Sequence, residues 1–259
     1  LSEMLRSFTS VYQLLPIFPC VQSADGSMAR PSEIDIPHID RLRAKAADAF
    51  YREIHKAVLA NRADREYRAA ACRILPLVGT FQPTLQVGRI AGERVEMFSR
   101  HPDHDLQGDG TVPQTSAYPI EWDANKPDEK VVYATERHSA IQNDNAVLAN
   151  LVGELGGFKV NLGAYRGAGA LALEITPLFS ADEPVSFTLS SQEPLSRFLV
   201  RVENADSRTA IYQSEFNARS ALNRRIELGK FPAGTYRLTV RRPAVGRPDD
   251  SVSEVLLLM

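Results

Sequence analysis

The sequence predicts an α/β fold over residues 1–157, followed by a small all-β, sandwich-like domain over residues 168–259. Three observations support this prediction. In the first part, short apolar runs alternate with amphipathic segments, which is typical of strands and helices that follow one another along the chain. In the second part, single apolar and polar residues alternate, as they do in half-buried strands. Between the two parts stands a glycine-rich stretch, GGFKVNLGAYRGAG, in which we expect the boundary, near residues 158–168.

The composition excludes several classes of protein. A chain of 259 residues, 44% of them hydrophobic and 24% charged, can bury a substantial core in one or two domains. The formal net charge of −2 lacks the excess of positive charge that is typical of nucleic-acid-binding proteins, so we expect no nucleic-acid partner. No apolar run approaches the roughly 20 residues of a membrane-spanning helix. Two cysteines, Cys20 and Cys72, leave both a disulfide and a pair of free thiols open.

The amino terminus, LSEMLRSF, has neither an initiator Met nor a signal peptide, and we expect a processed or truncated product. The amino terminus does not identify the cellular compartment. Of the possible locations, we favour the extracellular space or the cell envelope over the cytoplasm. The oligomeric state is left open.

Helices are expected mainly in the first 73 residues. Residues 1–15 are typical of a helix end, and a loop rich in Pro, Ser and Gly follows Pro16. From His38 to about Asn61, apolar residues recur at spacings of three and four, with charged residues on the other face. These apolar positions are Leu42, Ala46, Ala49, Phe50, Ile54, Ala57 and Val58. A second helix is expected from about Asp64 to Arg73.

Short strands follow. ILPLVG (74–79) and KVVYAT (130–135) are apolar runs that indicate buried strands, and PTLQVGRIAGERVEMF (83–98) has the pattern of a hairpin around AGE. After residue 138 an apolar helical face runs to Leu155, and Gly156 or Gly157 is expected to cap that helix.

Strict alternation begins after residue 168. The residues expected to point inward are Val185, Phe187 and Leu189, then Phe198, Val200 and Val202, then Tyr236, Leu238 and Val240. No cluster of exposed aromatic or acidic residues indicates a ligand, so we prefer a folding or packing accessory to a carbohydrate-binding module.

Two residues carry the chemistry. The carboxylate of a Ser-His-Asp triad holds an imidazole in one tautomer and stabilises its protonated form. Gly108 and Gly110 give Asp109 the backbone freedom of a tight turn, and Pro113 fixes the exit. His138 lies between an expected strand and an expected helix, on a loop that can reach a nucleophile. Taken singly, each is better explained as a turn aspartate or a loop histidine, but together they predict a triad acid and base.

The nucleophile is missing from the sequence. In α/β-hydrolases the chain order is Ser, then Asp or Glu, then His, with the serine in a Gly-x-Ser-x-Gly elbow. No such elbow occurs here, and the serines at 7, 10, 99, 116 and 139 lack the flanking glycines and a preceding apolar strand. The order therefore predicts that the serine lies upstream of residue 1.

Four segments together resemble the lecithin:cholesterol acyltransferase-like lipases: RSFTSVYQLLP (6–16), LVGTFQPT (77–84), GDGTVPQTSA (108–117) and ERHSAIQNDNAVLANL (136–151). The family's acid falls on Asp109 and its histidine on His138. The match covers roughly residues 1–155. It departs from the family pattern at Thr9, where proline is usual before the serine, and in the absence of the elbow and oxyanion-hole strands.

The resemblance implies the C-terminal part of an α/β-hydrolase fold, with cap helices at about 38–73, an Asp loop at 108–113 and a His loop at 136–140. It implies a serine-dependent hydrolase or O-acyltransferase for lipid or other acyl esters, without a cofactor or metal, and with this chain alone inactive. The apolar stripe of the helix at 38–61 is better explained as part of the core, and contact of the cap with a membrane surface is the alternative. The alternative is a non-catalytic hydrolase-like scaffold whose β domain serves as an interaction module.

Metal binding is the other interpretation of the segment DHDLQGDG (103–110). Asp103, Asp105, Gln107 and Gly108 imitate the start of an EF-hand loop, but its twelfth position would be Gln114 instead of a bidentate Glu. His101, Asp103 and His104 stand at metal-ligand spacing, although a solvated polar loop explains them better.

Overall fold

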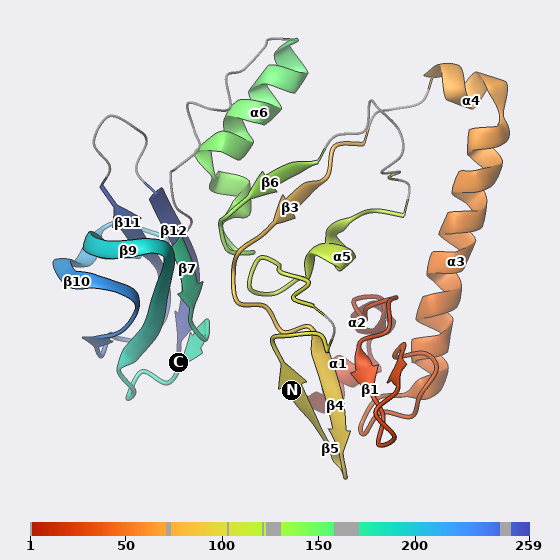
Figure 1. Cartoon of the computed structure of the whole chain (residues 1–259), viewed down its shortest axis with the longest axis horizontal. Helices are drawn as coiled ribbons and strands as arrows, with labels where there is room; N and C mark the ends of the chain where they lie inside the picture. The colour runs from red at the N-terminus through yellow and green to blue at the C-terminus, as the bar shows by residue number, and fades with distance from the viewer. Residues whose placement is uncertain are drawn as a thin grey trace. The chain divides into compact units, whose positions relative to one another are not determined.

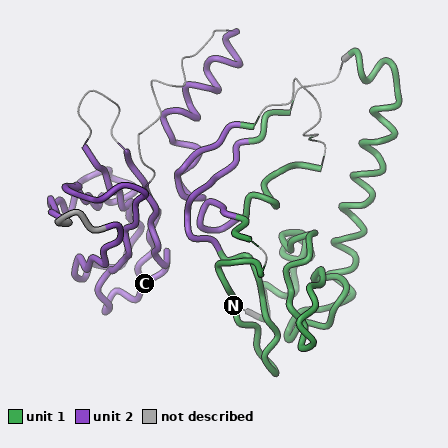
Figure 2. Tube along the Cα trace, viewed as in Figure 1, with its two compact units in different colours: residues 1–76, 85–106, 113–131 green, residues 77–84, 107–112, 132–259 purple. Residues whose placement is uncertain are grey.

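The computed structural model describes residues 2–70, 74–102, 104–120, 122, 131–157, 171–243 and 250–259. The chain forms two compact units, shown in Figure 2. Unit 1 comprises residues 1–76, 85–106 and 113–131, and unit 2 comprises residues 77–84, 107–112 and 132–259. The expected boundary at residues 158–168 lies outside the described residues.

Unit 1 contains one long helix and a small sheet. The helices are α1 (Ser2–Ser7), α2 (Thr9–Tyr12), α3 (Arg41–Ala63), α4 (Arg65–Ala70) and α5 (Gln114–Ala117). The sheet has the order β2-β1-β4-β5, with β1 at Val21–Gln22, β2 at Met28–Ala29, β4 at Val87–Ala91 and β5 at Arg94–Phe98. The expected hairpin around AGE is confirmed, since Ala91 pairs with Arg94.

The expected long helix corresponds to α3 and begins at a cap. The Asp40 side chain accepts hydrogen bonds from the backbone N–H groups of Leu42 and Arg43, which satisfies donors that have no partner inside the helix. Ala44 and Ala47 pack against the buried ring of Tyr12. Among the described residues, no helix is long and apolar enough to cross a membrane. Cys20 is a buried free thiol, and Cys72 lies outside the described part.

Unit 2 begins with a pair of parallel strands and a helix. Strand β3 (Leu77–Gly79) pairs with β6 (Val132–Ala134), and a 3₁₀ turn, η1 (Ile141–Asn143), leads into α6 (Asn145–Gly156). Helix α6 ends at Gly157, whose φ of 69° is the left-handed conformation that glycine adopts without strain. The glycine cap is as expected, and strands lie within both expected segments, but each is only three residues long and β6 is only partly buried, with Tyr133 55% exposed.

The rest of unit 2 is one curled sheet (Figure 1). Its order is β10-β9-β11-β12-β8, with β7 beside β9. The strands are β7 (Leu171–Glu174), β8 (Leu178–Phe179), β9 (Val185–Asn204), β10 (Ala210–Gly229), β11 (Gly234–Arg242) and β12 (Asp250–Leu258). The first half of β9 pairs with β7 and its second half with β11.

The curl follows from a change of phase within β9. The odd-numbered positions are buried from Val185 to Ser191 and again at Leu195, whereas from Phe198 to Val202 the even-numbered positions are buried. The register with β10 shifts at the same place, as it does at a β-bulge, which bends a strand. The inward-pointing residues expected from alternation are all buried, in one core enclosed by this sheet.

The predicted fold class is wrong. Strands take up 38% of the described residues and helices 25%, and the largest sheet is curled and mostly antiparallel. The described residues do not form the broad parallel sheet of an α/β-hydrolase, since β3 and β6 pair only with each other, over three residues. The error has a physical cause. A short buried run has the same pattern in a two-stranded pair as in the centre of a wide sheet, so periodicity alone does not give the number of neighbours.

Candidate active site

Asp109 lies in a loop of unit 2 that runs alongside the end of β3. The Gln82 N–H donates to Gly108 O at 3.0 Å, and residues 82 and 109 form an isolated parallel bridge. Gly79, the last residue of β3, allows this close approach, because a Cβ added there would lie 2.2 Å from the Asp109 Cβ. The Asp loop is therefore fixed by backbone contacts on one side.

His138 follows β6 and meets Asp109 through two hydrogen bonds. Its backbone N–H donates to Asp109 O at 2.9 Å, and its ring Nδ1 lies 2.8 Å from Asp109 Oδ2. The distance between Nδ1 and Oδ2 lies within the roughly 2.6–3.2 Å that a carboxylate–imidazole hydrogen bond of a triad requires. The two residues are 29 positions apart in the sequence, and the neighbouring strands β3 and β6 bring their loops together.

The carboxylate of Asp109 is held in one orientation. Its Oδ1 accepts hydrogen bonds from Thr111 N at 2.9 Å and Val112 N at 2.7 Å, while Oδ2 meets the imidazole. The Asp109 side chain is 8% exposed, whereas that of His138 is 54% exposed. A carboxylate that accepts from Nδ1–H selects the neutral tautomer in which Nε2 has the free lone pair. The arrangement can therefore present a proton acceptor at an accessible ring.

The two glycines around Asp109 each have a positive φ, and each lies close to another group that a side chain would meet. Gly110 has φ of +91°, and a Cβ there would come within 2.8 Å of the Arg137 guanidinium. Gly108 has φ of +152°, and a Cβ there would lie 2.5 Å from Val112 O. The Gly110 N–H also donates to Thr84 Oγ1 at 2.8 Å, so the turn is anchored to the segment that follows β3.

Ser116 and Ser139 are the serines nearest in the sequence to Asp109 and His138, and neither lies in a nucleophile elbow. The Ser139 hydroxyl donates to the Glu254 carboxylate and accepts from Val255 N at 3.2 Å, so it is engaged with β12. Ser116 belongs to α5, a helix of four residues that begins after Pro113 and not after a buried strand. The structure supplies no nucleophile from these positions.

Glu136 is a buried carboxyl group two residues before His138. It is 5% exposed, and its Oε2 accepts a hydrogen bond from Ser253 N at 2.8 Å. Burial raises the pKa of Glu136 from 4.5 to about 7, and the nearby charge of Asp144 adds to that rise. The hydrogen bond from Ser253 acts in the opposite direction.

The sequence did not reveal the residues that support the two loops. Gln82, 2% exposed, donates through Nε2 to Leu171 O at 2.8 Å and accepts at Oε1 from Leu173 N at 2.8 Å. Arg137 is ion-paired with Glu254. These partners are about 90 and 117 positions away along the chain, and no local pattern connects them.

Metal binding finds no support in the described residues, which contain no group of three or more His, Cys, Asp or Glu side chains that could hold an ion. The rings of His101 and His104 lie 5.4 Å apart, and Asp103 is outside the described part. Asp105 accepts a hydrogen bond from Gln86 Nε2.

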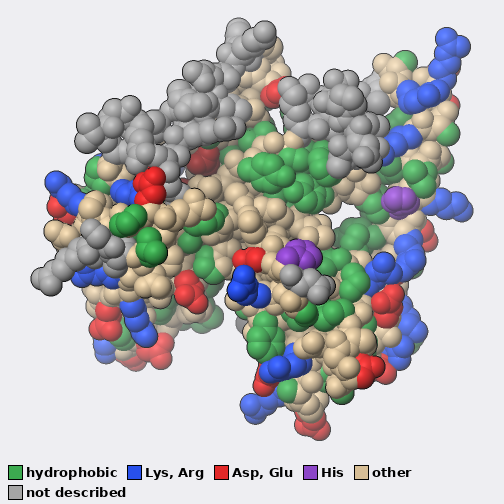
Figure 3. Space-filling model, in the orientation of Figure 1, with side chains coloured by type: hydrophobic (Ala, Val, Ile, Leu, Met, Phe, Trp, Pro, Cys, Tyr) green, Lys and Arg blue, Asp and Glu red, His purple; other side chains and the backbone are tan. Residues whose placement is uncertain are grey.

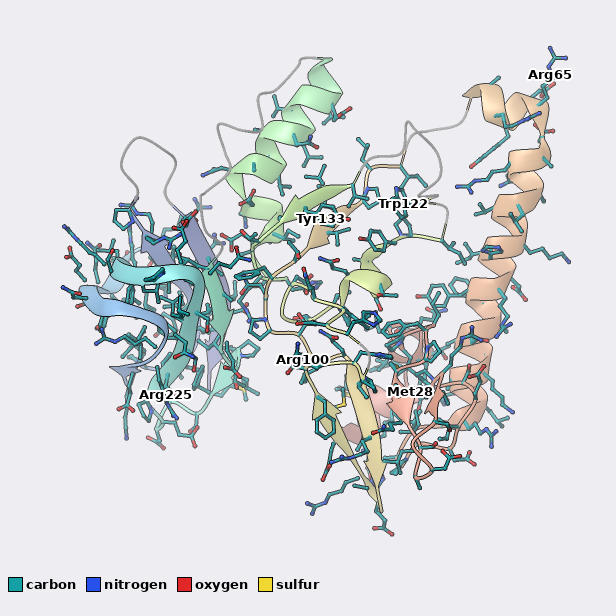
Figure 4. All side chains as sticks on the ribbon, viewed as in Figure 1. Met28, Arg65, Arg100, Trp122, Tyr133 and Arg225 are labelled. Carbon is teal, nitrogen blue, oxygen red and sulfur yellow. The ribbon has the colours of Figure 1, made fainter. Side chains whose placement is uncertain are left out.

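Unit 1 has a cleft of about 360 Å³ beside β5. Its lining includes the apolar residues Val87 and Phe98 and the basic residues Arg89 and Arg100. The Arg89 guanidinium lies 4.6 Å from the Phe98 ring and pairs with Glu96. Arg100, labelled in Figure 4, follows the last residue of β5, Phe98.

No protein-family model matches the chain, and no curated protein matches it. Among solved structures, an engineered protein aligns with 57% of this chain at 10% identity and a TM-score of 0.29, and this chain spans only 24% of its length. A superoxide reductase (neelaredoxin) from Ignicoccus hospitalis aligns with 34% of this chain and 80% of its own, at 9% identity and a TM-score of 0.26. A DUF3244-family protein from Bacteroides vulgatus, with an immunoglobulin-like β-sandwich fold, aligns with 27% of this chain and 73% of its own, at 16% identity and a TM-score of 0.22. These likenesses identify no family for the chain.

Proposed function

We propose that Asp109 and His138 are the acid and base of a serine-dependent hydrolase or O-acyltransferase that acts on lipid or other acyl esters. The observation that carries the proposal is the 2.8 Å contact between a buried carboxylate and a half-exposed imidazole. A surface ion pair would leave both groups exposed. Here one partner is fixed by the backbone and the other is open to a reacting group, which is the arrangement that general-base catalysis needs.

Each group has a defined task. Asp109 keeps His138 in the tautomer with Nδ1–H and stabilises the imidazolium that forms during the reaction. Nε2 takes the proton of a serine hydroxyl as that oxygen attacks the ester carbonyl, and then returns it to the leaving alcohol. In the second half of the reaction, Nε2 takes a proton from water or an acceptor alcohol as that oxygen attacks the acyl-serine. It then gives the proton to the serine oxygen, which leaves as the acyl–serine bond breaks.

The serine and the oxyanion-binding amides would come from a segment that this sequence does not contain. This part of the proposal rests on the absence of a Gly-x-Ser-x-Gly motif from the sequence and on the engagement of Ser139 with Glu254. The acyl-ester class of substrate rests on the four segments that resemble the lecithin:cholesterol acyltransferase-like lipases. Contact of α3 and α4 with a lipid surface is proposed on the same basis.

The test uses the intact gene product, a fluorophosphonate probe and a short-chain nitrophenyl ester. We expect the probe to label one serine, in a Gly-x-Ser-x-Gly context. Asp109→Asn should lower kcat by about 10⁴-fold, because the amide selects the wrong imidazole tautomer, and His138→Ala should have a comparable effect.

A matched control is His55→Ala, which removes an exposed histidine from α3 and should leave the rate unchanged. If the intact protein binds no probe, or if neither Asp109 nor His138 affects hydrolysis, the enzyme proposal fails. The non-catalytic scaffold would then be the better interpretation.

A further inference from the structure

The residues on both sides of His138 are hydrogen-bonded to β12, the last strand of the curled sheet (β7–β12), which we also call the C-terminal sheet. Arg137 is ion-paired through Nε with Glu254 Oε2, and the Ser139 hydroxyl donates to Glu254 Oε1. One carboxylate thus holds the residue before His138 and the residue after it. A further contact, from Ser253 N to Glu136 Oε2 at 2.8 Å, extends the attachment by one residue.

Glu254 occupies a position where an apolar residue is expected. It stands between Val252 and Leu256, which alternate with it along β12 and are fully buried in the core of the sheet. Glu254 itself is 5% exposed and Arg137 is 4% exposed. A buried ion pair often stabilises a fold no more than apolar residues of the same size, so its presence favours a role in fixing a specific arrangement.

The same contacts bind backbone groups of two neighbouring strands. Strands β7 and β12 contact each other across the curled sheet (Figure 1), although β7 pairs with β9, and β12 pairs with β11 and β8. Arg137 Nη1 donates to Leu173 O of β7, while its Nε meets Glu254 of β12. Gln82 bonds Leu171 O and Leu173 N, and Ser139 accepts from Val255 N. Backbone groups at a strand edge need such partners, and here the segments that carry the Asp–His pair provide them.

The attachment also reaches the Asp loop. The Arg137 guanidinium lies so close to Gly110 that a Cβ on Gly110 would be 2.8 Å from it. Arg137 therefore packs against the residue after Asp109 and also precedes His138 in the chain. A displacement of its guanidinium would move both loops.

We propose that Glu254 is a positioning residue for His138, and that the C-terminal sheet is thereby a working part of the catalytic site. The inference rests on the proposed function. Glu254 fixes Arg137 and Ser139, these fix the backbone of His138, and the imidazole then stays within hydrogen-bond distance of Asp109. The sheet is not a detachable binding module in this arrangement.

The test measures the Asp109–His138 hydrogen bond directly in this chain and needs no activity. The proton that Nδ1 shares with Asp109 is observed by NMR on ¹⁵N-histidine-labelled protein and assigned by its loss in His138→Ala. In Glu254→Gln we expect its exchange with solvent to rise by about ten-fold or more, because local opening of the loop governs that exchange. The amides of β9 and β11 should keep their protection.

Glu215→Gln is the matched control, since Glu215 lies on the same sheet in an exposed ion pair with Arg197 and should leave the exchange at the wild-type rate. If Glu254→Gln does not fold, the double variant Arg137→Met, Glu254→Met replaces both charges by apolar groups, keeps the sheet folded and should show the same rise. Wild-type exchange in either folded variant overturns the proposal. Failure of the proposed function would appear separately, as an intact protein without esterase activity in which Glu254→Gln still loosens the histidine.

Discussion

Gly79 leaves the space that the Asp109 side chain occupies: a Cβ on Gly79 would lie 2.2 Å from the Asp109 Cβ and 3.2 Å from its Cγ. The backbone of Gly79 does not require glycine by its φ, so the requirement is steric. An alanine at this position forces the Asp loop away from β3. We expect Gly79→Ala to cost about 1–3 kcal/mol in unfolding free energy, as overpacking does, and to break the contact between His138 and Asp109.

Chemical denaturation and the NMR signal of the shared proton check this expectation. Gly26→Ala is the matched control, because its φ of +87° makes alanine strained while no atom lies within 4 Å of the added Cβ. That variant should lose stability without changing the signal of His138. A Gly79→Ala variant with an intact Asp109–His138 signal would show that the loop can relax around the added methyl group.

Glu136 should make the protein less stable as the pH rises. Its pKa is about 7 in the folded state against 4.5 in the absence of its surroundings, so the folded state binds more protons between these values. The stability that this group contributes is complete below pH 4.5 and is lost as the pH rises through 7. The loss amounts to about 3 kcal/mol, because a difference of one in pKa between the folded and unfolded states corresponds to about 1.4 kcal/mol. The positive charge of Arg237 lowers the pKa and limits the effect.

Glu136→Gln removes the titration and keeps the acceptor oxygen for Ser253 N. We expect its unfolding free energy, measured in urea from pH 5 to pH 8, to lack the decline that the wild type shows. Glu227→Gln, an exposed substitution on β10, should decline like the wild type. An equal decline in Glu136→Gln and wild type would mean that other groups cause it.

The sequence predicts the local structure better than the tertiary arrangement. Alternation in PVSFTLS, RFLVRV and GTYRLTV identifies the buried faces of β9 and β11, because a period of two depends only on neighbouring residues. The polar residues from Ser190 to Glu193 and the following Pro194 suggest a turn, yet β9 continues through them as one strand of 20 residues. The stretch is held at both ends: Ser190 pairs with Asn223 of β10 and Ala172 of β7, and Leu195 pairs with Ala221 of β10.

The candidate site shows the same division. Glycines around an aspartate and a histidine after a strand are local signals, and they identified Asp109 and His138. Glu254 and Gln82 hold these loops through partners more than 80 positions away, and nothing near them in the sequence indicates it. One signal was available: in DSVSEVLLL the glutamate takes an inward position of an alternating strand, where a buried charge needs a partner.

The outer face of α6 should promote self-association. Leu148, Leu151, Val152 and Leu155 are 44%, 38%, 63% and 88% exposed, and Tyr133 on β6 is 55% exposed. Figure 3 shows hydrophobic side chains gathered over β3 and β6 on one face of the molecule. Exposed apolar patches of this kind mark contact sites or aggregation liabilities. We expect Leu155→Asp to lower the apparent mass by light scattering, whereas Leu222→Asp, at a 56% exposed leucine of β10, should not.

The isolated chain should not hydrolyse esters. A histidine paired with an aspartate accepts a proton only from a nucleophile that reaches Nε2, and triad members act as a unit, so the loss of the serine costs roughly as much as the loss of all three. Ser139 is bound to Glu254, and Ser116 lies in a short helix without an elbow. We expect the purified chain to leave a fluorophosphonate probe and a nitrophenyl ester unreacted above background. Ser139→Ala should leave this result unchanged. Stoichiometric labelling of a serine that His138→Ala abolishes would show that the nucleophile lies within this chain.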